Sequence, residues 1–301
     1  MYSKILVPLD GSTVAEQVLP YARFLAARLK VPVELLGVVD PAAIAVSGLT
    51  HNPRYVGKLT EEGRRASESY LARVSQAFSE KSVTRHVEIG NPAGVIIDRA
   101  AQDKSALVAM ATHGRTGMSR WLLGSVAEKV LRGGTNPLLL VRAGVGGRGD
   151  GGVEFEFVIV PLDTSPTAEA VLYDVVDLAK LLDLKVILMH AYEIPLSAYY
   201  GAEDYSTPNY RNLAAHLRDE GRKYLDGKVE DLKRRGLAKV SSVLLEGSAA
   251  EEIIALTRNQ PNSFVAISTH GYSGVKRWML GSVTEKVARH CDDPVLVVRA
   301  E

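Results

Sequence analysis

Thr112-His-Gly-Arg-Thr-Gly-Met-Ser-Arg-Trp-Leu-Leu-Gly-Ser-Val-Ala-Glu-Lys-Val130 is the stretch that decides the fold, because it occurs twice. The second copy runs from Thr269 to Val287, and 13 of the 19 positions are identical. Each copy follows an apolar run, Ala106–Ala111 or Phe264–Ile267, and precedes a helix-like pattern. An apolar run, a glycine-bearing loop and then a capped helix form the layout of an anion site in an α/β sheet.

The start of the helix carries the anion-binding signal. Ser125-Val-Ala-Glu128 and Ser282-Val-Thr-Glu285 match the capping-box pattern, which predicts a serine at each N-cap. The glycine before each serine has no Cβ, so a phosphate can approach the free N–H groups of the first turn. The alternative is a capped helix after a glycine turn, without a ligand. The repeated spacing favours the phosphate site.

With this spacing the sequence resembles the universal stress protein family, with two family domains in tandem. ATP-binding members carry glycine, two residues, glycine, nine residues, glycine, and then serine or threonine. Both halves match the second and third glycines, which are Gly114 and Gly124 in the first half. Ala111 and Ser268 stand where the family has the first glycine. The resemblance covers nearly the whole chain.

Composition is typical of a globular protein with two domains. The chain has 301 residues, of which 46% are hydrophobic and 24% charged. Its formal net charge of +1 argues against a nucleic-acid or membrane surface. The N-terminus enters an apolar run directly, so we expect no signal peptide and a cytoplasmic protein. Cys291 is the single cysteine, which excludes an internal disulfide and fits a reducing compartment.

Glycine marks the boundary between the halves. Residues 143–152 hold six glycines and predict a flexible linker. We expect one domain at residues 1–143, the linker at 144–152 and a second domain at 153–301. Short apolar runs alternate with helical patterns, which indicates α/β domains with parallel sheets. The resemblance implies two Rossmann-like, adenine nucleotide alpha hydrolase-like domains, each a five-stranded parallel sheet flanked by helices, related by pseudo-two-fold symmetry.

The first half shows the expected order of elements. We expect strands over residues 5–9, 33–39, 83–89, 106–111 and 137–142. We expect helices over residues 12–29, 60–79, 93–102 and 126–131, with a loop between Asp40 and Thr60. The offset between the copies is 153 at Asp10 and Asp163 but 157 at Gly90 and Gly247. We therefore predict a four-residue insertion in the second half, in the loop over residues 195–209.

Four segments of each half are expected to meet at the carboxyl ends of the strands, where open α/β sheets bind ligands. The resemblance implies that this edge holds ATP, ADP or AMP. The implied residues of the first half are Pro8, Leu9, Asp10, Val38, Gly90, Met110, Ala111, His113, Gly114, Arg115, Gly124, Ser125 and Val126. Those of the second half are Pro161, Leu162, Asp163, Ala191, Gly247, Ile267, Ser268, His270, Gly271, Gly281, Ser282 and Val283.

The resemblance also implies roles. Asp10 and Asp163 would approach the adenosine or an indirectly bound Mg²⁺, although each also fits a local turn or a cap of the next helix. The strand ends would line the base and ribose pocket, and the glycines with the following serine and valine would hold the phosphates. Arg115 is tyrosine at the equivalent position of the second half, so the two sites should differ.

No catalytic residue is assigned. His113 and His270 suit a general base, but neither half shows a nucleophile and an orienting acid beside them, so packing or phosphate contact is favoured. The sequence has no Walker-type phosphate loop, no dinucleotide fingerprint after the first strand of either half, and no zinc spacing.

Three functions follow from these residues. The leading one is an ATP-binding regulatory or stress-tolerance module without fast turnover. The second is a slow ATPase or a nucleotidyl-transfer relative, and missing catalytic groups count against it. The third is a nucleotide-free interaction scaffold, and the intact Gly-Ser pairs count against it.

The last strand of each half predicts how the halves assemble. Pro137–Arg142 and Pro294–Arg299 should be apolar edge strands, and a proline suits the first residue of an edge strand. We expect the two strands to pair antiparallel within one chain, so that the chain is equivalent to a family homodimer. The alternative is pairing with another chain, which gives a homodimer or a larger oligomer.

Overall fold

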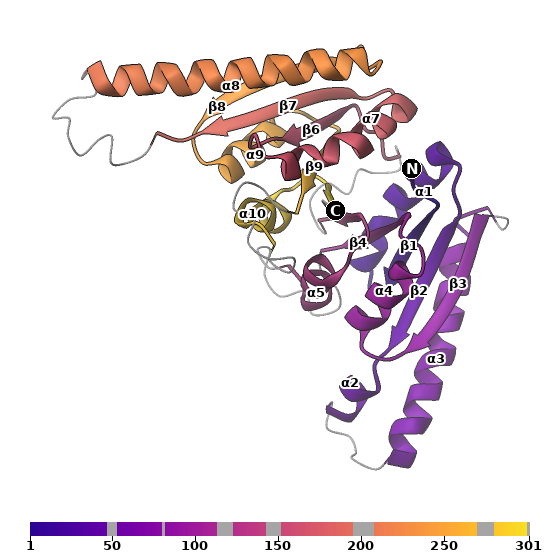
Figure 1. The fold of residues 1–301 in the computed structure, drawn as a ribbon. Helices are drawn as coiled ribbons and strands as arrows, with labels where there is room; N and C mark the ends of the chain where they lie inside the picture. Colours follow the sequence, from indigo (N-terminus) through magenta and orange to yellow (C-terminus); the bar gives the residue numbers. More distant parts are fainter. Residues whose placement is uncertain are drawn as a thin grey trace. The chain divides into compact units, whose positions relative to one another are not determined.

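The protein divides into two compact units, residues 1–154 and 155–301. The structure is a computed structural model, and it describes residues 1–46, 53–79, 82–112, 123–142, 152–194, 208–269 and 280–299. Each unit is a layered α/β fold (Figure 1). The predicted linker lies outside the described residues except for Gly152.

The first unit contains one parallel sheet in the order β3-β2-β1-β4-β5. Its strands are β1 (Lys4–Leu9), β2 (Val33–Val39), β3 (Val83–Ile89), β4 (Ala106–Ala111) and β5 (Leu138–Val141). Its helices are the 3₁₀ helix η1 (Ala15–Val18), α1 (Leu19–Leu29), α2 (Pro41–Val46), α3 (Pro53–Ser75), α4 (Pro92–Ala101) and α5 (Ser125–Gly133). The central strands are continuous apolar runs because helices cover both of their faces.

The second unit repeats this plan with the order β10-β9-β6-β7-β8. Its strands are β6 (Phe157–Pro161), β7 (Lys185–Tyr192), β8 (Val240–Glu246), β9 (Ser263–Ser268) and β10 (Val295–Val298). Its helices are α6 (Pro166–Glu169), α7 (Val171–Leu182), α8 (Pro208–Arg234), α9 (Ala249–Arg258) and α10 (Ser282–His290). The predicted fold class, with a five-stranded parallel sheet in each half, is confirmed.

The long helix of each unit lies along its outer strands. In Figure 1, α3 runs beside β2 and β3, and α8 runs beside β7 and β8. The chain leaves β1 toward β2 and β3 and later returns to β4 on the other side of β1. This reversal is the topological switch point at which open α/β sheets bind ligands.

Two predicted helix starts in the first unit are wrong. The helix expected from residue 12 begins as η1 and becomes α1 only at Leu19. Pro20 has no N–H to donate to the carbonyl of Glu16, so it interrupts an α-helix that starts earlier but fits the first turn of α1. The stretch after Asp40, predicted as a loop, is helical where it is described. The Asp40 Oδ1 atom accepts the amides of Ala42 and Ala43 at 2.9 and 3.3 Å and so starts α2. Helix α3 starts at Pro53, before the predicted Thr60.

The four-residue insertion is also distributed differently from the prediction. Tyr70 of α3 lies near Glu16, and Tyr224 of α8 lies near Glu169, so these tyrosines are equivalent at an offset of 154. The following strands start at Val83 and Val240, an offset of 157. Three of the extra residues therefore follow Tyr224, where α8 continues to Arg234. Lengthening a helix adds about one intrahelical hydrogen bond for each added residue, so the insertion leaves the number of unpaired end groups unchanged.

A charged cluster lies under α4 in the first unit. The Glu34 carboxylate is 5% exposed and accepts the Lys4 ammonium at 2.7 Å and the Arg99 guanidinium at 2.5 Å. Burial raises the pKa of Glu34, but the hydrogen bonds from Lys4 and Arg99 outweigh it and hold the pKa below its ordinary value. The equivalent second-unit residues are all apolar: Phe157, Ile187 and Leu256.

We expect Glu34→Ile alone to destabilise the first unit by about 3 kcal/mol, because it leaves Lys4 and Arg99 without their carboxylate. The triple change Lys4→Phe, Glu34→Ile, Arg99→Leu copies the second unit and should be close to neutral at pH 7. A lowered pKa contributes stability above the ordinary carboxyl pKa of 4.5, and this contribution is lost as the pH falls further. The triple variant should therefore lose less stability between pH 5 and 3. Amide exchange of β1 and β2 measures both effects, and equal acid sensitivity of wild type and triple variant would contradict the account.

Candidate functional site

A turn after β1 begins the candidate site of the first unit. In this Asp10 turn (residues 8–12), the Asp10 Oδ1 atom accepts the Ser12 amide at 2.9 Å and the Ser12 hydroxyl at 2.6 Å. The Ser12 Oγ atom in turn accepts the Ala15 amide at 3.1 Å. Gly11 has a φ of 83°, which a residue without Cβ adopts readily. The carboxylate thus organises the turn, as the local alternative predicted.

The second unit builds the same turn from different residues. In this Asp163 turn (residues 161–165), the Asp163 Oδ1 atom accepts the Ser165 amide at 3.1 Å and its hydroxyl at 2.6 Å. Ser165 is the N-cap of α6, and its Oγ atom accepts the Ala168 amide at 3.1 Å. Thr164 stands where the first unit has glycine, and its φ is 71°. Positive φ is strained for a β-branched residue.

The N-terminus of α5 begins one residue earlier than the capping-box prediction. Gly124 is the N-cap, because its carbonyl accepts the first intrahelical amide, that of Glu128, at 2.8 Å. Ser125 is therefore the first residue of the helix and not its N-cap. The Gly124 amide donates to the Thr112 carbonyl at 2.7 Å, which ties the helix start to the end of β4. The amides of Ser125 and Val126 precede the intrahelical ladder and point out of the first turn.

Helix α10 starts in the same way. The Gly281 carbonyl accepts the Glu285 amide at 2.9 Å, and the Gly281 amide donates to the Thr269 carbonyl at 2.8 Å. The capping box predicted at Ser282 is also wrong by one residue. Two helix N-termini with glycine N-caps therefore lie at the ends of equivalent strands. Such ends attract anions, since backbone N–H groups and the helix dipole act together.

The remaining predicted residues lie at the same edge of each sheet. Gly90 continues the sheet by donating its amide to the Val39 carbonyl at 2.9 Å, and Gly247 donates to the Tyr192 carbonyl at 2.9 Å. The other strand-end residues are Pro8, Leu9, Val38, Met110 and Ala111 in one unit and Pro161, Leu162, Ala191, Ile267 and Ser268 in the other. The parallel register brings them to one edge in each unit.

The glycine loops themselves are outside the described residues. This applies to the predicted residues His113, Gly114, Arg115, His270 and Gly271. The strand end before each loop and the helix start after it are described, so the two ends of each loop are located. The described residues on either side of each loop lie at the carboxyl edge of the sheet, and their part in ligand binding stays a prediction.

Comparison with known proteins identifies the family. The model of the universal stress protein family matches residues 1–142 and 154–299. The chain belongs to the universal stress protein family.

Its relatives include both single and tandem proteins. A universal stress protein of Methanocaldococcus jannaschii is 34% identical over 145 residues, which cover 47% of this chain and 83% of that protein. One from Mycolicibacterium smegmatis is 24% identical over 302 residues, covering 98% of this chain and 96% of that protein. The crystal structure of a universal stress protein from Archaeoglobus fulgidus covers 99% of both chains with a TM-score of 0.70 and 21% identity.

Sequence reasoning missed a polar layer beside each Asp turn of this tandem universal stress protein. Tyr70 and Tyr224 lie on the long helices, near Glu16 and Glu169 respectively. Burial raises the pKa of both tyrosines, and the nearby carboxylates act in the same direction. One signal was available: a glutamate follows the turn aspartate by six residues in both halves.

Three further observations concern the cysteine, metal binding and membrane spans. Burial raises the pKa of Cys291 to about 11, so the thiol stays protonated and is a poor nucleophile, as expected of a buried structural cysteine. Among the described residues, no group of three or more His, Cys, Asp or Glu side chains is placed to hold a metal ion. Within the same ranges, no helix is both long enough and apolar enough to cross a membrane.

One difference between the two helix starts can be tested. The Thr284 hydroxyl donates to the Ser268 carbonyl at 2.8 Å, while the first unit has Ala127 at this position. We expect Thr284→Val to destabilise the second unit by about 1 kcal/mol, because a buried carbonyl loses its donor. Thr284→Ser keeps the hydroxyl and is the matched control. Urea unfolding with amide exchange of β9 measures the change. Equal losses in both variants would refute this role for the hydroxyl.

Proposed function

We propose that each half of this universal stress protein binds an adenine nucleotide, and that the protein acts as a nucleotide-responsive regulatory or stress-tolerance module. One observation carries the proposal. In both units, the first amides of a glycine-capped helix and an aspartate turn follow neighbouring strands at the same edge of the sheet. Outward backbone amides suit phosphates, and the flanking apolar strand ends suit a base and a ribose.

The residues divide into two parts in this proposal. The amides of Ser125, Val126, Ser282 and Val283 hold the phosphates, together with Gly114, Arg115 and Gly271 of the loops. Val38, Met110 and Ala111, with Ala191, Ile267 and Ser268, line the base and ribose pocket. The Ser268 hydroxyl is buried and finds no hydrogen-bond partner among the described residues, so a ribose or phosphate oxygen is a suitable partner.

Magnesium has only an indirect place in the proposal. One oxygen of Asp10 and one of Asp163 already organise their turns. Magnesium in nucleotide sites is commonly held by phosphates, waters and one or two carboxylates, and this chain offers one carboxylate per turn. The residues therefore fit a metal bound mainly through the nucleotide. Cytoplasmic action is part of the proposal, since Cys291 is the single cysteine and a chain without an internal disulfide fits a reducing compartment.

The first site should bind nucleotide at least as tightly as the second, because Arg115 gives phosphate a charged donor where the second half has tyrosine. Denaturing the purified protein should release ATP, ADP or AMP. Calorimetry should then show that Gly124→Asp loses at least as much affinity as Gly281→Asp. A larger loss in Gly281→Asp would reverse the order. The absence of both bound nucleotide and titratable binding would favour the scaffold, and turnover with added Mg²⁺ would favour the slow ATPase.

The assembly proposal concerns the edge strands β5 and β10. Each is the last strand of its own sheet and is wholly apolar, Leu138–Val141 and Val295–Val298. An edge strand has unpaired backbone groups that a second edge can satisfy. We propose that β5 and β10 pair antiparallel within one chain, around a pseudo-two-fold axis. A homodimer formed through the same strands is the competing assembly.

Leu139→Pro and Leu296→Pro should each loosen the two halves, because proline removes a ladder donor. The amides of Leu138–Val141 and Val295–Val298 should exchange slowly in the intact chain, independent of protein concentration. Arg85→Pro in the other edge strand, β3, is the control and should not affect these amides. Rapid exchange in the intact chain would rule out paired edges. Protection that disappears on dilution would assign the pairing to a homodimer.

A further inference from the structure

The Asp163 turn is more strained than its counterpart and is held by more side chains. Thr164 has the left-handed backbone that Gly11 supplies in the first unit. A residue in this region persists only where its surroundings hold it, and such residues concentrate at ligand sites. The side chains that hold the turn come from β7 and from α8.

His190 holds the turn from the sheet side. Its Nδ1 atom lies 2.7 Å from the Leu162 carbonyl oxygen. Since a carbonyl only accepts, Nδ1 carries the proton and donates it. The Leu162 amide donates to the Met189 carbonyl at 2.8 Å, so both polar backbone groups of Leu162 are bonded to β7.

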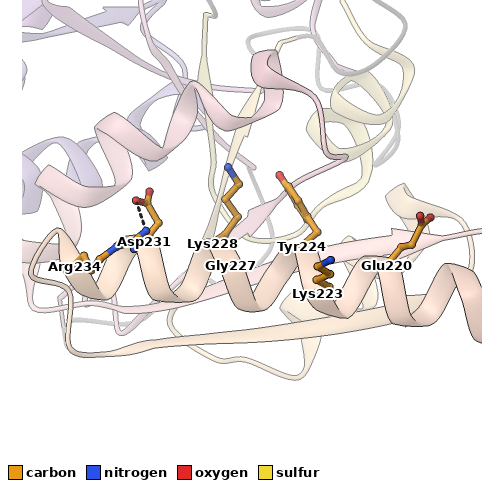
Figure 2. Close-up of a pocket in the computed structure, with 7 residues that line it drawn as sticks. All are labelled: Glu220, Lys223, Tyr224, Gly227, Lys228, Asp231 and Arg234. Carbon is orange, nitrogen blue, oxygen red and sulfur yellow. Dashed lines mark ion pairs between the residues drawn. The ribbon is translucent and has the colours of Figure 1, made fainter.

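Helix α8 holds the turn through Glu169, the last residue of α6. The Tyr224 hydroxyl donates to one Glu169 oxygen at 2.8 Å, and the Lys228 ammonium donates to the other at 2.6 Å. Figure 2 shows Tyr224 and Lys228 projecting from the same side of α8, one turn apart. Glu169 and Lys228 are each 26% exposed, which strengthens their interaction relative to a surface pair. Helix α6 is only four residues long, and its N-cap Ser165 is hydrogen-bonded to Asp163. The contacts of Glu169 with α8 therefore restrain the Asp163 turn through this short helix.

The first unit has weaker counterparts of these contacts. Glu16 meets Arg73 at 3.7 Å, and the arginine side chain is 67% exposed. Buried Val74 stands where α8 has Lys228. Gly37 stands where β7 has His190, and a Cβ atom at Gly37 would lie only 2.2 Å from the Ser67 Oγ atom. In the second unit Gly221 takes the place of Ser67 and lies against the His190 ring. Each unit thus pairs one glycine with one larger residue: the glycine is on the strand in the first unit and on the long helix in the second.

We propose that Glu169, Tyr224, Lys228 and His190 form a clamp that positions the strained Asp163 turn for the nucleotide of the second site; this rests on the proposed function. The four are positioning residues, since each acts through Leu162, Ser165 or Asp163. The first site, with Gly11 in an unstrained turn, does not depend on such a clamp. Nucleotide affinity of the second site therefore depends on α8, while that of the first is independent of α3.

Binding by the second site is measured in the full chain carrying Gly124→Asp, with ATP as the probe. Lys228→Met and Tyr224→Phe should each lower affinity about fivefold, and Lys228→Arg should restore most of it. Lys223→Met is the matched control, because Lys223 lies on α8 and makes no bond to Glu169 among the described contacts. Tyr70→Phe in the Gly281→Asp chain tests the first site and should have no effect.

Coupling to Thr164 separates a clamp from a general loss of stability. In a Thr164→Gly background the turn is no longer strained, so Lys228→Met should cost less than twofold in affinity. The same fivefold loss with threonine and with glycine would overturn the proposal, and so would an equal loss in Lys223→Met.

Amide exchange in the nucleotide-free protein tests the clamp without any ligand. Exchange at residues 163–169 should speed up in Lys228→Met and Tyr224→Phe but not in Lys223→Met. Unchanged exchange would overturn the clamp even if nucleotide binds. If the wild-type protein binds no nucleotide while exchange does speed up, the proposed function fails and the clamp stands as a structural device only.

Discussion

The hydrogen bond from the Gly124 amide to the Thr112 carbonyl, repeated between Gly281 and Thr269, is the constraint on which the candidate site depends. It joins the first residue after β4 or β9 to the N-cap of the next helix. The first amides of the helix are then held at the edge where the sheet order reverses. A glycine N-cap leaves this approach open, whereas a serine side chain would have occupied one of the amides.

The tandem repeat allows a described contact in one unit to be compared with the equivalent position in the other. Glu34, Lys4 and Arg99 form a charged cluster where the second unit packs Ile187, Phe157 and Leu256, yet both sheets have the same order. The fold therefore does not require those charges, in agreement with the small net contribution of buried ion pairs compared with apolar packing. The replacement of Gly37 and Ser67 in the first unit by His190 and Gly221 in the second also leaves the sheet order unchanged.

The inner strands were predictable because they are apolar runs, and the outer strand β3 because its residues alternate; β2, β3 and β4 match the predicted ranges. Helix starts were less predictable, since Ser125 satisfies a sequence pattern whose geometry is decided by the bond of Gly124 to Thr112. The Tyr224–Glu169 contact was not predictable, because the two residues are 55 positions apart and meet only after α8 packs on the sheet. The edge position of the site followed from topology, while the polar layer around it required tertiary structure.

The two Asp turns reach one geometry by different physical means. In the first unit Gly11 adopts positive φ without steric cost, so a single aspartate and serine suffice to define the turn. In the second unit Thr164 carries a Cβ in the same conformation, and its strain must be offset by contacts from outside the turn. Those contacts come from α8 and β7. The second turn is therefore held more strongly by its long helix than the first, where Tyr70 and Arg73 of α3 lie near Glu16. The two halves thus share the backbone conformation of the turn but stabilise it with different side chains. Two sites of similar backbone can therefore respond differently to changes in the position of their long helices.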